Sequence, residues 1–370
     1  MSVPGEATST PADMMASVPS YGGSVDGGCR LPARVFAFGF SFRKRAILRR
    51  FAPGTVVRFV DQGTRIPAGA TLLLWGSTAL PAGLAPGVQI VRIEDGFLRS
   101  VGLGADLIHP ASWVLDGSGI YYDATRPSDL EQLLQAGEFD AALLARAASL
   151  RQHIAANGLT KYNTGSSGWN RPAGASHVIL VPGQVESDAS IRYGAPAVNT
   201  NMGLLRAVRA AQPDACIVYK PHPDVQAGLR AAGQGEGEAA RWCDAMVTDV
   251  SMAALLPMVD AVHVMTSLAG FEALLRGKSV TCHGLPFYAG WGLTTDMLPS
   301  PRRSRPLSLD ELVAGALIRY PAYVSRATGL RTSPEIVLDE LIALRSRTRT
   351  RLPLWRKLLR QVLRRVDGVR

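Results

Sequence analysis

The sequence predicts an α/β protein built from two successive α/β units that face each other across a cleft. Short apolar runs alternate with helix-like or turn-like segments from Ala33 onward. The alternation restarts after residues 158–176, which are rich in Gly, Ser and Asn and have the composition of a linker. At 370 residues, the chain is also too long for one ordinary core. Parallel strands gather ligands beyond their carboxyl ends, so a pair of such units places a binding cleft between them.

The individual elements follow from the apolar runs and their flanking residues. The expected strands lie at 35–40, 56–60, 71–76, 88–95, 119–123, 177–181, 216–219, 261–267 and 279–284, and the expected helices at 128–135, 201–211 and 270–277. The resulting division has five parts: a leader at 1–30, an N-terminal domain at 31–165, a C-terminal domain at 166–300, C-terminal helices at 301–345 and a basic tail at 346–370.

Composition narrows the class of protein. A hydrophobic share of 47% with 19% charged residues is typical of a globular chain. The four cysteines are far apart and form no zinc-like cluster, so we expect no metal, no disulfide framework and a reducing cytosol. Residues 1–30 lack the basic and apolar regions of a signal peptide and are expected to be a disordered leader. No uncharged run approaches the ~20 residues that span a bilayer, which predicts a soluble or peripheral protein.

The net charge of +10 is concentrated in the C-terminal tail. Residues 345–370 hold ten Lys or Arg and one acid, Asp367. On a helical wheel, residues 351–366 form an amphipathic helix, with Trp355 and five aliphatic residues on one face and basic residues on the others. This pattern favours binding to an anionic membrane surface, and the alternative is a helix docked on the protein's own core. No aromatic-basic interleaving indicates a nucleic-acid partner.

The ends of two neighbouring predicted strands carry polar groups suited to an anion. Lys220 and His222 follow the strand at 216–219, and the prolines on either side of His222 restrict its backbone. Thr266 and Ser267 end the next strand where a helix begins, and free N–H groups there favour an anion. Each feature alone has an ordinary structural explanation, but their occurrence at consecutive strand ends indicates a phosphate site.

Several longer motifs resemble one module of the capsule polysaccharide β-Kdo transferases of the KpsC/LipB type. They are EDGFLRSVGLG at 94–104, GIYYDAT and PSDLEQLL at 119–134, TKYN at 160–163, GQVESDASI at 183–191, KPHPDV at 220–225, and TSLAGFEALLRGKSV with GLPFYAGWGLT at 266–294. The resemblance runs from about Arg34 to Asp296. It implies a GT-B glycosyltransferase with two Rossmann-like domains.

The resemblance also implies a donor, an acceptor and a location. The donor is CMP-β-Kdo, Kdo is transferred with retention, and the acceptor is a Kdo-lipid of the lyso-phosphatidylglycerol type or a glycan. The enzyme is expected in the cytoplasm on the inner face of the bacterial inner membrane, with other capsule biosynthesis proteins as further candidate partners. The nucleotide or donor would be bound by residues of the second domain: Lys220, His222, Pro223, Thr266, Ser267, Glu272 and Gln184.

Retention is most simply achieved by double displacement, which needs two carboxylates in the cleft. Asp188 matches an acidic position of the family motif and is assigned as the nucleophile. Glu94 is assigned as the acid/base from the opposing domain, with Asp95 as the alternative. The sequence has no Asp-x-Asp, and a phosphate leaving group can be stabilised by histidine, hydroxyls and a helix start without a metal.

The carboxylate of Kdo calls for a basic partner, and Arg99 and Lys161 fit that need, with Asn163 beside them. Arg99 has the alternative role of bracing the Gly-rich loop. Two other hypotheses stay open: a non-catalytic capsule-assembly adaptor at the membrane, and a GT-B transferase with another nucleotide-sugar donor. The best-known family members carry two modules, whereas this chain carries one.

Overall fold

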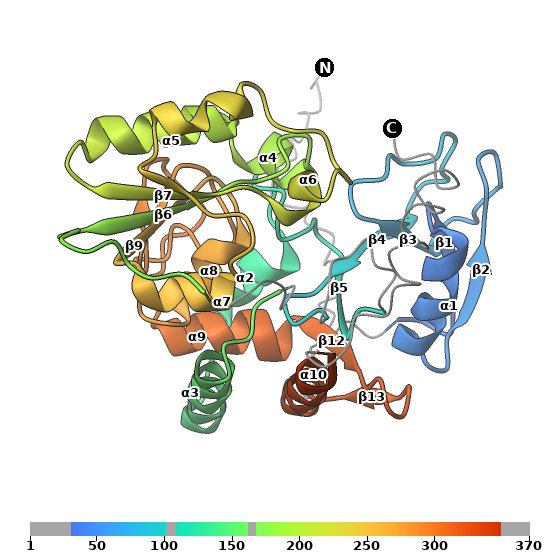
Figure 1. Ribbon diagram of the computed structural model, residues 1–370. Helices are drawn as coiled ribbons and strands as arrows, with labels where there is room; N and C mark the ends of the chain where they lie inside the picture. Colours follow the sequence, from blue (N-terminus) through green and yellow to red (C-terminus); the bar gives the residue numbers. More distant parts are fainter. Residues whose placement is uncertain (1–30, 101–108, 162–167, 349–370) are drawn as a thin grey trace, which may run out of the picture.

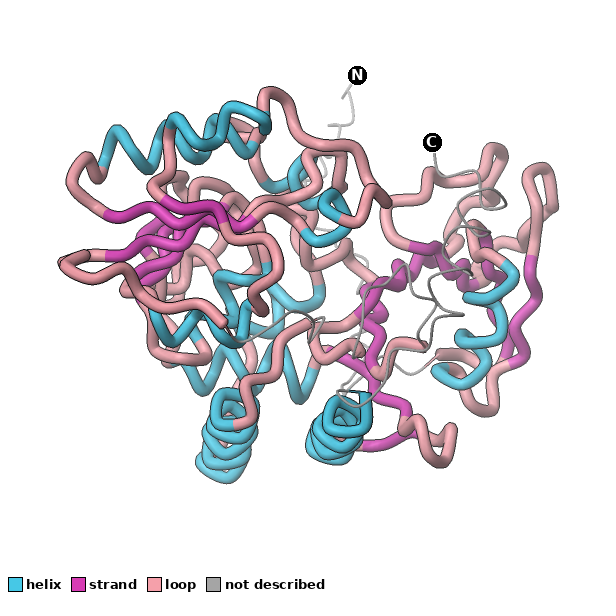
Figure 2. Tube along the Cα trace, viewed as in Figure 1, coloured by secondary structure: helices cyan, strands magenta, loops and turns pink. Residues whose placement is uncertain are grey.

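The computed structural model describes residues 31–100, 109–161 and 168–348. It contains two β-sheets, each with its own helices, arranged side by side as the alternating sequence pattern predicts (Figure 1). Both halves contain strands, and most of the helices lie in the half that holds the second sheet (Figure 2). The predicted leader, most of the basic tail including residues 351–366, and Asn163 lie outside the described residues.

The first sheet has seven strands in the order β13-β12-β5-β4-β3-β1-β2. Its strands are β1 (Arg34–Phe38), β2 (Val56–Phe59), β3 (Thr71–Trp75), β4 (Gln89–Asp95), β5 (Ser112–Asp116), β12 (Pro321–Val324) and β13 (Arg331–Thr332). β1 to β4 are parallel, and β5, β12 and β13 continue the sheet in antiparallel pairs. Helix α1 (Phe42–Phe51) buries Leu48 and Phe51 in a core shared with this sheet.

The second sheet has six strands, all parallel, in the order β11-β10-β9-β6-β7-β8. They are β6 (Val178–Pro182), β7 (Cys216–Lys220), β8 (Ala245–Met246), β9 (Ala261–Val264), β10 (Ser279–Cys282) and β11 (Thr295–Asp296). In chain order this is the doubly wound arrangement, in which the direction of winding reverses between β6 and β9. Ligands of such sheets bind beside the carboxyl ends of the two strands at that reversal.

The helices of the second half follow its strands in turn. They are α4 (Ala189–Gly194), α5 (Asn201–Ala211), α6 (Pro223–Gln226), α7 (Met252–Leu255) and α8 (Leu268–Leu274), with 3₁₀ turns at Glu236–Arg241 and Leu256–Met258. β6 is buried along its whole length, as expected for a parallel strand covered on both faces.

The chain crosses between the halves more often than a simple two-domain division implies. Helices α2 (Asp129–Ala136) and α3 (Ala141–Ala156) follow the first sheet but share the large core of the second half, together with α9 (Leu309–Val313) and the π-helix at Ala314–Arg319. The chain then returns to the first sheet through β12 and β13, and its described part ends in α10 (Pro334–Thr348), which contacts α3 through the Arg146–Glu335 ion pair at 2.8 Å.

Two details differ from the sequence-based expectation. The region 301–345, expected to contain helices, also contains β12 and β13, because β12 pairs with β5 about 200 positions away along the chain and β13 pairs with β12. Residues 119–123 were predicted to be a strand but are irregular, and the fifth strand is 112–116 instead. The two tyrosines of 119–123 pack as aromatic side chains on a loop, at 5.3 Å between ring centroids.

A buried ion pair joins the first half of the chain to the FYAGWG loop at 287–292. The Arg303 guanidinium donates to Glu131 at 2.9 Å and to the carbonyls of Pro286 and Ala289. We expect Arg303→Met to lower the free energy of unfolding by about 3 kcal/mol, because it removes one of the two arginines paired with the buried Glu131 and takes a donor away from two buried carbonyls. Urea unfolding measures this loss.

The matched control for that variant is Arg241→Met. Arg241 pairs with Glu238 at 3.1 Å, but both side chains are largely exposed, so its loss should cost less than about 1 kcal/mol. Equal losses in the two variants would contradict a stabilising role for the Arg303–Glu131 pair.

Candidate active site

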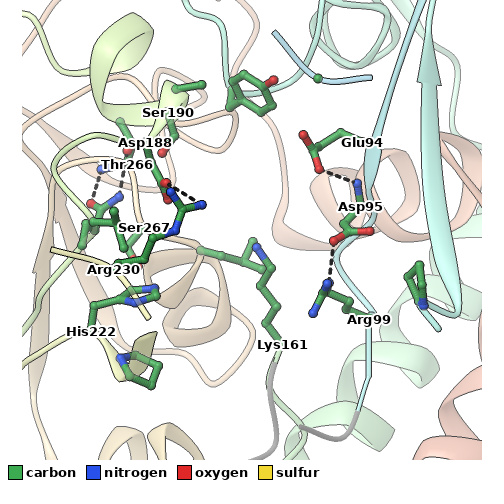
Figure 3. Close-up of a pocket in the computed structure, with 18 of the residues that line it drawn as sticks. Glu94, Asp95, Arg99, Lys161, Asp188, Ser190, His222, Arg230, Thr266 and Ser267 are labelled. Carbon is green, nitrogen blue, oxygen red and sulfur yellow. Dashed lines mark hydrogen bonds and ion pairs between the residues drawn. The ribbon is translucent and has the colours of Figure 1, made fainter. Parts of the chain in front are cut away.

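A cleft of about 1070 Å³ lies between the two halves. Its walls come from the carboxyl ends of β3 and β4 and the start of α1 on one side, and from the carboxyl ends of β6, β7 and β9 on the other. Figure 3 shows Asp188, His222 and Thr266 on one wall and Glu94 and Asp95 on the other. Every described residue that the sequence assigned to the site lines this cleft.

Gln184 and Thr266 meet where the winding of the second sheet reverses. The Gln184 Nε2–H donates to Thr266 Oγ1 at 3.0 Å, and the Thr266 backbone N–H donates to Gln184 Oε1 at 2.9 Å. Gln184 also accepts from Asn201 Nδ2 through its backbone carbonyl at 2.9 Å. Gln184 therefore fixes Thr266 at the cleft wall. Because the Thr266 hydroxyl oxygen accepts this bond, its O–H group can still donate to another acceptor.

Ser267 begins α8 as expected, and its hydroxyl accepts from the Ala269 backbone N–H at 3.2 Å. Tyr288 packs against the first turn of α8, and its hydroxyl donates to the Ser267 carbonyl. A Cβ at Gly270 would collide with the Tyr288 ring, so the glycine permits this close approach. Tyr288 and Trp291 are fully buried and do not line the cleft, so they support its wall from behind.

His222 caps the short helix α6 and lies in the cleft wall. Its Nδ1 accepts from the Asp224 backbone N–H at 3.1 Å, so the ring proton is on Nε2. Burial lowers the pKa of His222 to about 4, so the ring is neutral at pH 7. Lys220 is also buried, and its ammonium donates to the Thr248 carbonyl at 3.2 Å. His222 can therefore donate one hydrogen bond to an anion, while Lys220 braces the strand end.

Asp188 directly precedes α4 and makes no side-chain bond with that helix. Its side chain is 44% exposed, and its carboxylate lies 4.0 Å from the Arg230 guanidinium. Arg230 lines the cleft but was not predicted, because the stretch around it has no strand or helix periodicity and no motif. Glu186, two positions before Asp188, instead accepts from the backbone N–H groups of Asn201 and Gln234.

Glu94 and Asp95 end β4 on the opposite wall, where their environments differ. Burial, followed by the charge of Asp95, raises the pKa of Glu94 to about 7. Asp95 forms an ion pair with Arg99 at 2.6 Å and accepts from Trp113 Nε1 at 3.1 Å. Gly76 lies against the Glu94 carboxylate, and a Cβ there would be 2.9 Å from Oε2. Glu94 can thus exchange a proton near neutral pH, whereas Asp95 is held by structural partners.

Lys44 is a second cleft residue that sequence reasoning missed. Its ammonium lies 3.5 Å from the centre of the Trp75 ring, and Trp75 packs against Trp113 at 5.1 Å. Burial lowers the pKa of Lys44, and the charges of Glu94 and Asp95 oppose that effect. In the sequence, Lys44 is one of five basic residues at 43–50, so nothing in the pattern distinguishes it.

Three further predicted residues take the following places. Lys161 lies between the two walls (Figure 3), and its backbone N–H donates to Glu272 at 2.6 Å. Glu272 is buried, and burial raises its pKa to about 7. Arg99 lines the cleft and forms its ion pair with Asp95 on that wall.

Comparisons with known proteins agree with this architecture. Residues 77–166 and 152–331 match the model of a family described as "Capsule polysaccharide biosynthesis protein". The capsule polysaccharide modification protein LipA of Neisseria meningitidis serogroup A is 44% identical over 323 residues, which are 85% of this chain and 46% of LipA. The chain therefore spans about half the length of this curated relative.

Two solved structures from Thermosulfurimonas dismutans are also similar. KpsC described as a beta Kdo 2,7 transferase is 42% identical, with a TM-score of 0.71 over 84% of this chain and 99% of the other. KpsC described as a beta Kdo 2,4 transferase is 33% identical, with a TM-score of 0.74 over 83% and 97% of the two chains. The fold is accordingly GT-B-like. The chain belongs to the capsule polysaccharide biosynthesis family and, within it, to the capsule Kdo transferases of the KpsC/LipB type.

Proposed function

We propose that the protein is a retaining β-Kdo transferase that moves Kdo from CMP-β-Kdo to a Kdo-lipid or glycan acceptor in capsule or surface polysaccharide synthesis. One observation carries this proposal: a carboxylate on each wall of the cleft, Asp188 and Glu94, with the polar strand ends that carry His222 and Thr266 beside the first. The similarity to solved Kdo transferases supports the sugar, and the geometry supports a double displacement.

In the proposed first step, Asp188 attacks the anomeric carbon of Kdo. The bond from that carbon to the phosphate oxygen breaks, and its electron pair leaves with CMP. The Nε2–H of His222 and the hydroxyls of Thr266 and Ser267 face the cleft from one edge and would donate to the departing phosphate. This arrangement stabilises the leaving anion through dipoles fixed before the reaction starts, and it assigns no metal to the step.

In the second step, an acceptor hydroxyl attacks the same carbon from the face that CMP has left. The bond to Asp188 breaks, and the hydroxyl proton passes to Glu94. A carboxyl group with a pKa of about 7 is suited to this role, because a base works best when its pKa lies near the working pH. Two inversions give net retention.

The remaining assignments concern binding. Lys220, Pro223, Gln184 and Glu272 support the nucleotide side of the cleft, and Lys161 faces the sugar between the two walls. We place the reaction at the cytoplasmic face of the inner membrane, with the basic residues 351–366 contacting anionic lipids. Within the described residues, no helix is both long and apolar enough to span a bilayer.

The test is release of CMP by the purified protein from freshly generated CMP-Kdo, with and without a Kdo-lipid acceptor. We expect acceptor-dependent CMP release and a product in which the new linkage is β. Tight binding to anionic vesicles without CMP release would favour the adaptor hypothesis. Release from another nucleotide sugar, and not from CMP-Kdo, would replace the proposed donor.

A further inference from the structure

Arg230 is a charged cleft residue with no role in the chemistry described so far. Its Nη2 lies 4.0 Å from Asp188 Oδ1, and Figure 3 shows the two side chains together on the wall that carries His222. About half of the Arg230 side chain is exposed to the cleft. A guanidinium in this position can hold a second carboxylate without losing its contact with the first.

The segment that carries Arg230 is fixed to the same wall. The backbone N–H groups of Leu229 and Arg230 donate to the Asp224 carbonyl at 2.8 and 3.2 Å. The Gln234 N–H donates to Glu186 at 3.0 Å. These bonds join the segment both to α6, which His222 caps, and to the loop that leads into Asp188. These bonds therefore fix the backbone that carries Arg230 close to the loop that carries Asp188.

The chemistry of a 2-keto sugar acid makes this distance significant. The carboxylate of such a sugar is bonded directly to the anomeric carbon, which is the atom that the nucleophile attacks. A residue that binds this carboxylate must consequently lie within a few ångströms of the nucleophile. Arg230 meets this condition. Arg99, the earlier candidate, lies on the opposite wall and is paired with Asp95 at 2.6 Å.

Charge balance leads to the same residue. A sugar acid linked to CMP brings a phosphate and a carboxylate toward the anionic Asp188, and each close like-charge contact is unfavourable. His222 is neutral near pH 7 and contributes no positive charge. Lys161 and Arg230 both influence His222 as positive charges, which places these cations around the same part of the cleft.

We propose that Arg230 binds the anomeric carboxylate of the donor and thereby selects a sugar acid over neutral sugars. The inference rests on the proposed function and adds a specificity-determining residue to it. In the structure, Arg230 pairs with Asp188. With donor bound, it shares its guanidinium between the sugar carboxylate and the nucleophile, so that the two carboxylates approach one carbon without direct repulsion.

The experiment compares CMP-Kdo with CMP, because CMP has the phosphate but not the sugar carboxylate. We would measure kcat and KM for CMP-Kdo and the competitive inhibition constant of CMP, in the wild type and in Arg230→Met, Arg230→Lys and Arg192→Met. Arg192 is the matched control, since it is an exposed arginine on α4 that does not line the cleft.

We expect Arg230→Met to lower kcat/KM for CMP-Kdo by about 10- to 100-fold, and to change the inhibition constant of CMP by less than about twofold. The kcat/KM of Arg230→Lys for CMP-Kdo should lie between those of the wild type and Arg230→Met, because lysine keeps the charge but cannot form two parallel hydrogen bonds to a carboxylate. Arg192→Met should match the wild type.

Three results would overturn the inference, and they can be distinguished. Parallel weakening of CMP-Kdo and CMP would make Arg230 a phosphate ligand. Unchanged constants in Arg230→Met would make its pairing with Asp188 an ordinary surface contact. Absence of CMP release by the wild-type protein, with CMP still bound, would refute the proposed function itself and the carboxylate role with it.

Discussion

Asp188→Asn is expected to reduce CMP release from CMP-Kdo by about 10³-fold or more and to eliminate any covalent Kdo adduct. The amide has almost the same shape as the carboxylate but is not a nucleophile. Asparagine is also a favourable residue before a helix, so α4 should begin at the same position. The variant therefore removes the proposed reaction without removing the local structure. Intact-protein mass spectrometry after incubation with donor, followed by peptide mapping, measures both effects.

The control for this variant is Asp214→Asn, which makes the same chemical change at an exposed position outside the cleft. It should retain wild-type release and adduct formation. A wild-type adduct that maps to Glu94 or Asp95 would assign the nucleophile to the opposite wall. Full activity in Asp188→Asn would rule out the double displacement through this residue.

Glu94→Gln is expected to slow transfer to the acceptor by about 10²- to 10⁴-fold, because it removes the proposed proton acceptor of the second step. The first step does not use Glu94, so the covalent intermediate should accumulate in this variant. In the wild type, Glu94 acts as a base only when it has lost its proton. Transfer should therefore rise as pH increases through about 7, and Glu94→Gln should lack this rise. A rate-pH profile measured under saturating substrates checks both statements.

Two neighbouring variants should shift that profile in opposite directions. Asp95 raises the pKa of Glu94 through its negative charge, whereas Lys44 and Lys161 lower it. Asp95→Asn should consequently move the rise to lower pH, and Lys44→Met should move it to higher pH. Arg49→Met, an exposed change on the same helix as Lys44, is the control. A profile that stays unchanged in both variants would exclude Glu94 as the titrating group.

The sequence predicted the parts of the fold that depend on local patterns. The parallel strands of the second half and the polar residues at their ends were found from short apolar runs and the residues that follow them. β12 was missed because its identity as a strand depends on β5, far away in the sequence. No local pattern contains that information.

The candidate site likewise contains some residues that local sequence patterns identify and others that only the folded structure reveals. His222, Thr266 and Asp188 occupy strand or helix ends that the sequence marks clearly, and all three line the cleft. Arg230 and Lys44 were missed because their importance comes from what they approach in space: a carboxylate in one case and an aromatic ring in the other. The sequence also could not show that Arg99 is held by Asp95.

The return of the chain to the first sheet has a consequence for the order of folding during synthesis. β5 pairs with β12, and β12 pairs with β13, so the first sheet is complete only when residues 321–332 are available. All strands of the second sheet lie between Val178 and Asp296. During synthesis on the ribosome, the second sheet therefore has all its strands available before the first sheet does. Until residues 321–324 have been made, β5 has no partner on one side and remains an unpaired edge strand.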